Sequence, residues 1–487
     1  MNKTRTRFAP SPTGYMHIGN LRTALFEFLI AKHEGGDFLL RIEDTDQERK
    51  VEGAVDVIYK TLKECGLNWD EGPDIGGDFG PYVQSERLPM YKGYAEELIK
   101  LGGAHYCFCS EEEIEAQRKE AESLGISFKF NDPCKHLSAE EVQAKLDAGE
   151  PYVIRQTIKN VGETYFDDEV YGRIEVDGDV LDEQILIKSD GYPTYNFANI
   201  IDDHQMQISH VVRGNEYLSS TPKYNLIYDA YGWQRPTYVH VPPVMKDEHH
   251  KLSKRNGDAS FQDLVAKGYL PDAIMNYIAL LGWAPETEQE IYTLDELIKV
   301  FNIHRISKSP AIFDIDKLTW MNGVYLRNMD EETYYETVRP YLEKAVHGPY
   351  DLKEIAKIIQ PRSDILNQIE ESVDFFDTLV DYDLEMYRHK KMKTNPEVAL
   401  KALKASKATL EQFDNWDSME ALHDCLLALP KELEMKNGQV LWPIRTAVSG
   451  KQFTPGGAIE IAFILGKDET LRRIQVGIDR LSEIVEE

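Results

Sequence analysis

Apolar and polar residues near the start of the chain follow a pattern typical of a strand, a turn and a helix. Residues 4–9 form a short extended run, which 10–14 (PSPTG) interrupt with residues that cannot continue a ladder. From Leu21 apolar side chains recur at helical spacing until Gly35-Gly36, and 38–42 are again apolar. This order predicts a βαβ unit, with a ligand site at the carboxyl end of its strands.

The alternation of strands and helices is interrupted between about residues 96 and 187. A stretch rich in Glu and Lys with helical character (111–122) is followed by a run with β character (152–180). Because the alternation resumes at 184–188 and again at 210–213, we expect the interruption to be an inserted domain.

The pattern is mostly helical after about residue 322 and stays so to residue 487. There is no internal repeat and no linker rich in Gly or Ser. The chain is therefore predicted to be multidomain, with α/β and all-α parts.

Composition agrees with a folded protein of several domains. The 487 residues, 42% of them hydrophobic, suffice for three or so domains with buried cores. No apolar run follows the opening MNKTRTRF, and no apolar stretch is long enough to span a bilayer. Five cysteines are too few for a disulfide scaffold. We therefore expect a cytoplasmic protein without a membrane partner.

The net charge of -29 argues against a nucleic-acid partner, because Lys and Arg make the contacts to phosphate. One segment departs from this balance, with seven basic residues against the single acid Glu397. A solvated helix face is the simplest explanation, but a basic island in an acidic chain is also compatible with a selective RNA binder. The basic residues are Arg388, Lys390, Lys391, Lys393, Lys401, Lys404 and Lys407.

Two motifs suggest nucleotide chemistry. Residues 17–20 (HIGN) lie at the turn into the first predicted helix, where unpaired N–H groups and the helix dipole stabilise phosphate. Residues 251–255 (KLSKR) place three cations in a polar loop, where they can hold a triphosphate. Taken singly, each motif is more simply a capped helix or a solvated basic loop.

Three of the cysteines cluster in the sequence. Cys107-x-Cys109 is followed by Cys134-x-His136, which supplies three thiolates and an imidazole. That is a complete tetrahedral set for structural zinc, with no position left for water. Reduced cysteines buried in a core are the alternative interpretation.

The two nucleotide motifs together resemble the paired signatures of class I aminoacyl-tRNA synthetases, and longer segments narrow the resemblance. Over nearly its whole length the chain resembles the bacterial-type glutamyl-tRNA synthetases. Asn20 stands where that family usually has histidine, and Leu252 replaces a methionine of similar volume. The segments that carry the resemblance are 7–14 (RFAPSPTG), 41–46 (RIEDTD), 193–199 (PTYNFAN), 212–216 (VRGNE), 316–323 (DKLTWMNG) and 441–447 (LWPIRTA).

The resemblance implies a Rossmann-like catalytic domain, an inserted acceptor-binding domain and a C-terminal helical anticodon-binding region. The two halves of the catalytic domain are then 1–95 and 188–252. The insertion with its zinc site is 96–187, a stem-contact region with the KLSKR loop is 253–322, and the helical region is 323–487.

The implied activity is that of a glutamate-tRNA ligase, which activates glutamate with ATP and transfers it to the 3′-terminal adenosine of tRNA-Glu. The expected catalytic residues are His17 and Lys254. The expected ATP-binding residues are His17, Gly19, Asn20, Lys251, Ser253 and Lys254. The expected glutamate-binding residues are Arg7, Ala9, Ser11, Glu43, Tyr195, Asn199 and Arg213.

The same resemblance implies cofactors and an assembly state. Mg²⁺ is expected with ATP, and one structural zinc per chain is expected on Cys107, Cys109, Cys134 and His136. We expect the chain to act as a monomer. An arginine suits the side-chain carboxylate of glutamate because it can bind it with two parallel hydrogen bonds, and Glu43 suits the α-ammonium group.

Four other functions share some of these features. One is a non-catalytic RNA-binding relative, against which the presence of His17 and Lys254 argues. A glutaminyl-tRNA synthetase has the same catalytic motifs, but its anticodon-binding region is a β-barrel, whereas residues after 322 show little period-2 alternation. A truncated tRNA-modifying paralogue lacks the C-terminal half. A small-molecule adenylyltransferase needs no anticodon-binding domain. The sequence does not indicate whether tRNA-Gln is also charged.

Overall fold

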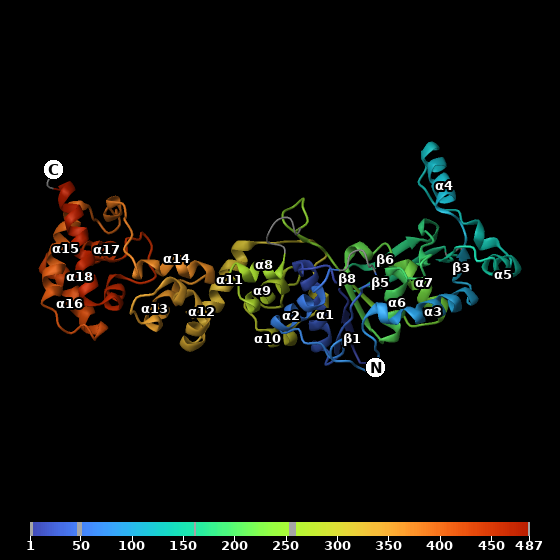
Figure 1. Cartoon of the computed structure of the whole chain (residues 1–487), viewed down its shortest axis with the longest axis horizontal. Helices are drawn as coiled ribbons and strands as arrows, with labels where there is room; N and C mark the ends of the chain where they lie inside the picture. Colours follow the sequence, from blue (N-terminus) through green and yellow to red (C-terminus); the bar gives the residue numbers. More distant parts are fainter. Residues whose placement is uncertain (1–2, 46–50, 160–161, 253–259, 486–487) are drawn as a thin grey trace. The chain divides into compact units, whose positions relative to one another are not determined.

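The computed structural model describes residues 3–45, 51–159, 162–252 and 260–485 (Figure 1). The chain divides into two compact units. The first holds Met1–Val265 and Pro271–Asp314, and the second holds Ala266–Leu270 and Ile315–Glu487. Across the described ranges, no helix combines the length and the apolar character needed to cross a membrane.

The predicted βαβ unit is present at the start of the first unit. Strand β1 (Arg5–Phe8) pairs in parallel with β2 (Asp37–Leu40), and α1 (Ile18–His33) connects them. The helix begins earlier than the expected Leu21, because the His17 side chain caps it by accepting a hydrogen bond from the Gly19 N–H group. Most of α1 is buried, so the unit is part of the core.

The main sheet of the first unit has the strand order β6-β5-β9-β8. Strands β8 (His210–Gly214) and β9 (Thr237–Val241) are parallel, β5 (Glu163–Asp168) joins β9 in parallel, and β6 (Gly172–Asp177) closes a hairpin on β5. Next to this sheet, the Ser209 N–H group donates to the carbonyl of Arg5 in β1. The hairpin β5–β6 lies within 96–187 in the sequence, yet it extends the sheet of β8 and β9.

A smaller antiparallel sheet lies in the segment predicted to be inserted. Its strands are β3 (Ala104–Cys107), β4 (Val153–Gln156) and β7 (Ile185–Ile187), in the order β3-β4-β7. Helices α4 (Glu111–Ser123) and α5 (Ala139–Asp147) occupy the connection between β3 and β4, each started by a Ser/Glu capping box. The first of these helices matches the predicted stretch 111–122.

The first unit also contains further α-helices and a short pair of strands. They are α2 (Ala54–Glu64), α3 (Leu88–Lys100), α6 (Tyr195–Gln205), α7 (Thr221–Tyr231), α8 (Phe261–Ala266), α9 (Pro271–Leu280), α10 (Leu294–Val300) and the short parallel pair β10 (Val244–Met245) and β11 (Ala311–Ile312).

The second unit is helical, as the sequence pattern predicted. Between residues 315 and 485 the structure describes no β-strand. Helices α15 and α17 pack on α18, which bends at Gly466, and the fully buried Arg473 of α18 donates to three backbone carbonyls. Its helices are α11 (Ile315–Asn328), α12 (Glu331–Ala345), α13 (Leu352–Ile359), α14 (Ile369–Val373), α15 (Pro396–Glu411), α16 (Met419–Glu432), α17 (Asn437–Ser449) and α18 (Ala458–Val485).

Gly36 gives a direct test of the βαβ unit. A Cβ atom at this position would overlap the backbone carbonyl of Thr4, where β1 and β2 approach each other. We therefore expect Gly36→Ala to lower the free energy of unfolding by about 1–3 kcal/mol, measured by calorimetry of the full chain. The matched control is Gly93→Ala in α3, where a Cβ meets nothing, so stability should rise by up to ~1 kcal/mol. An unfolding temperature for Gly36→Ala equal to that of the unaltered chain would contradict this packing.

Candidate functional site

His17 joins the two nucleotide motifs. Its Nδ1 accepts from the Gly19 N–H group at 3.0 Å, and its Nε2 lies 3.0 Å from the carbonyl oxygen of Leu252, the second residue of KLSKR. Since a carbonyl only accepts, Nε2 carries the proton in this hydrogen bond. His17 also forms an isolated antiparallel bridge with Ser260. Two segments 235 positions apart in the sequence therefore meet at the N-terminus of α1.

The other predicted ATP-binding residues are placed as follows. Gly19 lies in the first turn of α1, where a Cβ atom would come within 3.2 Å of His17 Nδ1, so glycine leaves room for the ring. Asn20 and Lys251 are exposed, and Lys251 bridges to Met245. Ser253 and Lys254 fall in 253–259, outside the described residues.

Arg7 forms ion pairs with two carboxylates, those of Asp203 and Glu27. Its Nε and Nη2 donate to the two oxygens of Asp203 at 2.8 and 3.2 Å, and its Nη1 donates to Glu27 at 3.1 Å. Arg41 donates to the same Asp203 at 2.8 Å and to Glu43 at 3.0 Å. Burial by itself would raise the pKa of Asp203, but the two arginines hold it below its ordinary value. The charge of Arg7 is thus balanced within the protein.

Arg213 is a buried cation of a different kind. No carboxylate of the described residues lies within ion-pair distance of it, although only 7% of its surface is exposed. Its guanidinium carbon lies 5.2, 4.8 and 5.4 Å from the ring centres of Tyr217, Tyr224 and Tyr238. Aromatic faces stabilise a cation without neutralising it, so Arg213 keeps its charge for a ligand.

Three further predicted glutamate-binding residues are Tyr195, Glu43 and Asn199. Both Glu43 and Arg213 interact electrostatically with Tyr195, and Asn199 lies about one turn after Tyr195 on α6. The ring centre of Tyr195 is 5.5 Å from that of Tyr217. Burial raises the pKa of Tyr195; the negative charge of Glu43 raises it further, whereas the positive charge of Arg213 lowers it. Burial also raises the pKa of Glu43, against the pull of Arg41. Asn199 is buried, and its Nδ2 has no hydrogen-bond partner among the described residues. A buried donor without a partner and an unneutralised cation each suit an anionic ligand.

Ala9 and Ser11 lie in the loop between β1 and α1, where Ala9 is partly buried and Ser11 is exposed. The structure places both after the carboxyl end of β1, the position in which such folds bind ligands.

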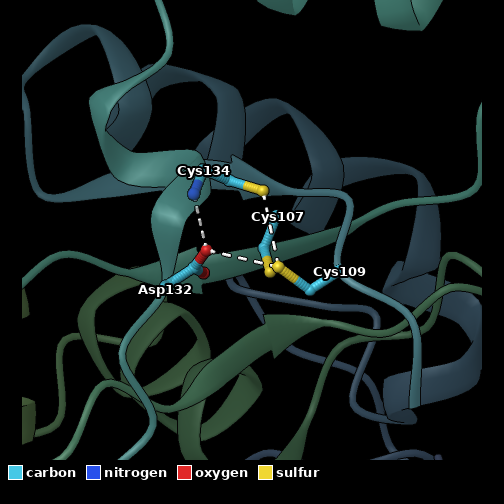
Figure 2. A group of neighbouring side chains, drawn as sticks. All are labelled: Cys107, Cys109, Asp132 and Cys134. Atoms are coloured by element: carbon cyan, nitrogen blue, oxygen red, sulfur yellow. Dashed lines mark hydrogen bonds between the residues drawn. The ribbon is translucent and has the colours of Figure 1, made fainter. Parts of the chain in front are cut away.

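Figure 2 shows the side chains of Cys107, Cys109, Asp132 and Cys134 converging at the end of β3. Their ligand atoms all lie within 4.8 Å of one another, and the sulfurs of Cys109 and Cys134 are 3.6 Å apart. Tetrahedral zinc with Zn–S bonds of about 2.3 Å requires sulfurs about 3.8 Å apart, so the three thiols fit a zinc ion.

The fourth residue of this group differs from the predicted one. His136 is exposed and lies outside the group, and the buried Asp132 takes the fourth place. Asp132 caps the 3-10 helix η3 (Pro133–His136) by accepting from the Cys134 N–H group, and it accepts from His105 at 2.9 Å. The spacing of cysteines and histidines did not reveal this carboxylate, because Asp132 lies outside the CxH pair.

Asp203 and the pair Asp168–His240 are further residues that sequence patterns did not single out. Each lies in a strand or helix and is buried. A charged side chain on a buried face is the one signal that the sequence offers for such positions.

The basic segment of the second unit is largely exposed. Of its seven Lys and Arg side chains only Lys407 is partly buried, and it pairs with Glu411. Arg388 pairs with Glu385, Lys390, Lys391 and Lys393 precede α15, and Lys401 and Lys404 lie within it. Because these side chains are exposed, the structure agrees with both a solvated helix face and an RNA contact.

Two family models match the chain. The model described as the catalytic domain of class I tRNA synthetases (E and Q) matches residues 3–320, and an anticodon-binding domain matches residues 333–478. The first covers the site around His17 and Arg213, and the second covers most of the helical unit.

Similar proteins and solved structures agree with these matches. A glutamate-tRNA ligase of Clostridium tetani is 60% identical over 480 residues, covering 99% of this chain and 98% of that protein. One of Clostridium acetobutylicum is 58% identical over 483 residues, covering 99% of each chain. A crystal structure of a glutamate tRNA ligase from Elizabethkingia meningosepticum, in complex with its amino acid, superimposes with a TM-score of 0.90 at 34% identity, covering 99% of this chain and 100% of that one. The chain therefore belongs to the glutamate-tRNA ligase family of class I tRNA synthetases.

Proposed function

We propose that this protein activates glutamate with ATP to glutamyl-adenylate and transfers the glutamyl group to the 3′-terminal adenosine of tRNA-Glu. The observation that carries the proposal is the hydrogen bond between His17 and Leu252, which brings the two nucleotide motifs to one helix N-terminus. The unneutralised Arg213 supplies a cation for the side-chain carboxylate of glutamate.

The residues divide the work of the first step, in which the glutamate α-carboxylate attacks the ATP α-phosphate and pyrophosphate leaves. Arg213 and Asn199 hold the amino acid, and Glu43 pairs with its ammonium group. N–H groups of the first turn of α1 bind phosphate oxygens. Both ring nitrogens of His17 are engaged, so Nε2–H must exchange the Leu252 carbonyl for a phosphate oxygen when it donates to ATP. Lys254 is expected to neutralise charge on the leaving pyrophosphate, and Mg²⁺ accompanies ATP.

Charging assays test this function. The protein is incubated with ATP, radiolabelled glutamate and either purified tRNA-Glu or tRNA-Gln, and the acid-insoluble label is counted. We expect glutamate to be attached to tRNA-Glu. His17→Gln should lower kcat/KM by roughly 10²-fold, the usual effect of losing one donor to a charged transition state.

His33→Gln is the matched control, since His33 is exposed at the other end of the same helix, and its activity should equal that of the unaltered protein. Failure of the unaltered protein to attach glutamate to tRNA-Glu would disprove the proposed function. Label on tRNA-Gln as well would extend the substrate range without changing the chemistry.

We also propose that the metal of the cysteine cluster is zinc, held by Cys107, Cys109, Cys134 and, as predicted from the sequence, His136. Asp132 is the rival fourth ligand. Its carboxylate already accepts from His105 and from the Cys134 N–H group and pairs with Arg155, which favours a supporting role beside the metal. When bound, the metal holds the segment around η3 to the end of β3.

Metal analysis by mass spectrometry separates these assignments. We expect one zinc per chain in the purified protein and its loss in Cys109→Ser. After dialysis against a weak chelator, His136→Ala should lose zinc, whereas Asp132→Asn should retain most of it. If His136→Ala retains zinc and Asp132→Asn loses it, Asp132 is the fourth ligand. Absence of zinc from the purified unaltered protein would refute the site.

The monomeric state and the cytoplasmic location stay predictions from the sequence. Sedimentation of the full chain tests the first, and fractionation of the source cells tests the second. Neither outcome alters the chemistry proposed for the site.

A further inference from the structure

Asp168 and His240 form a fully buried pair of side chains, and His240 contacts Arg213. His240 Nδ1 lies 2.6 Å from Oδ2 of Asp168, and the backbone N–H of His240 donates to the same oxygen at 3.1 Å. The other oxygen, Oδ1, accepts from the N–H groups of Val170 and Tyr171 at 3.0 and 2.8 Å. Four hydrogen bonds therefore fix this carboxylate at the end of β5.

His240 in turn contacts Arg213 on the neighbouring strand. The two residues are register partners in the parallel pair β8–β9, and Arg213 Nε lies 3.1 Å from His240 Nε2. A guanidinium only donates, so Nε2 must carry a lone pair; a carboxylate only accepts, so Nδ1 must carry the proton. These partners fix His240 as one neutral tautomer. Burial also lowers the pKa of His240, and the charge of Arg213 adds to this effect against the pull of Asp168.

Thr221 provides a second neutral acceptor. Its hydroxyl donates to the Tyr217 carbonyl at 2.8 Å, which leaves a lone pair for Arg213 Nη2 at 2.8 Å. Arg213 Nη1 has no hydrogen-bond partner among the described residues and is not one of the enclosed unpaired atoms. Two of the three guanidinium nitrogens are thus fixed, and the third is open to a ligand.

We propose that Asp168 and His240 are positioning residues that hold Arg213 for the side-chain carboxylate of glutamate without neutralising its charge. This inference rests on the proposed function. Arg7, which Asp203 and Glu27 contact directly, illustrates the difference, because its charge is balanced by carboxylates. At Arg213 the neutral imidazole of His240 lies between the guanidinium and Asp168. The carboxylate therefore orients the ring without contacting Arg213, and the guanidinium stays able to bind an anion.

A purely structural role for the same residues makes a different prediction. Asp168, His240 and Arg213 lie on the adjacent strands β5, β9 and β8, so their hydrogen bonds also join the sheet. Loss of a structural link lowers stability and the fraction of active enzyme. This reduces kcat but does not raise the KM for glutamate selectively. Loss of positioning raises the KM for glutamate and leaves the KM for ATP unchanged.

The test measures both KM values in ATP–pyrophosphate exchange with tRNA present, together with glutamate binding by calorimetry. His240→Phe keeps a ring but removes both hydrogen bonds, and we expect the KM and the Kd for glutamate to rise roughly 10- to 100-fold, the usual cost of a charge-assisted hydrogen bond. The KM for ATP should stay within about twofold of the unaltered value. His240→Gln, whose amide oxygen can still accept from Arg213, should recover part of the loss.

Two further variants keep the inference testable if His240→Phe does not fold. Thr221→Val retains the side-chain volume and removes the acceptor of Nη2, so the KM for glutamate should rise. Val239→Ala, at a fully buried position of the same strand, is the stability control, and it should lower the unfolding temperature while leaving both KM values unchanged.

An unchanged KM for glutamate in Thr221→Val and in folded His240→Phe, or an equal rise in both KM values, would overturn the inference while the proposed function stands. Unaltered protein that neither binds glutamate nor charges tRNA-Glu would contradict the proposed function and this inference with it.

Discussion

The ion pairs of Asp203 with Arg7 and Arg41 are the interaction on which the first unit depends. All three side chains are buried, and breaking such a pair by removing one partner typically costs about 3–5 kcal/mol, because it leaves a charge without compensation. Arg7 belongs to β1, Arg41 follows β2, and Asp203 belongs to α6. The network therefore fixes α6 against the βαβ unit, and α6 carries Tyr195 and Asn199.

The same principle distinguishes the two arginines expected to meet glutamate. Arg7 is paired with the carboxylates of Glu27 and Asp203, while Arg213 is held by an imidazole, a hydroxyl and three aromatic rings. A buried cation without a carboxylate is costly unless a ligand supplies one. At the N-terminus of α1, His17 joins the HIGN turn to Leu252 of the KLSKR motif. The expected amino-acid site and the expected nucleotide site therefore belong to one unit.

The sequence predicted the parts that periodicity and long motifs encode. The βαβ unit, the helical second unit and the clustering of three cysteines are present as expected. The start of α1 was placed too late, since the capping role of His17 is not visible as periodicity. His136 was expected beside the thiols, where the structure has Asp132. Asp203, Asp168 and His240 were not foreseen, because a buried polar residue shows its role only when its partner, distant in the sequence, is known.

A crystal structure with bound L-glutamate would show whether Arg213 is the cation that holds the side-chain carboxylate of the substrate. We expect the side-chain carboxylate to lie within hydrogen-bond distance, about 3 Å, of the Arg213 guanidinium, with Arg7 still paired to Asp203 and His240 still in contact with Arg213. A glutamate side chain bound to another cation, with Arg213 turned away from it, would contradict the account.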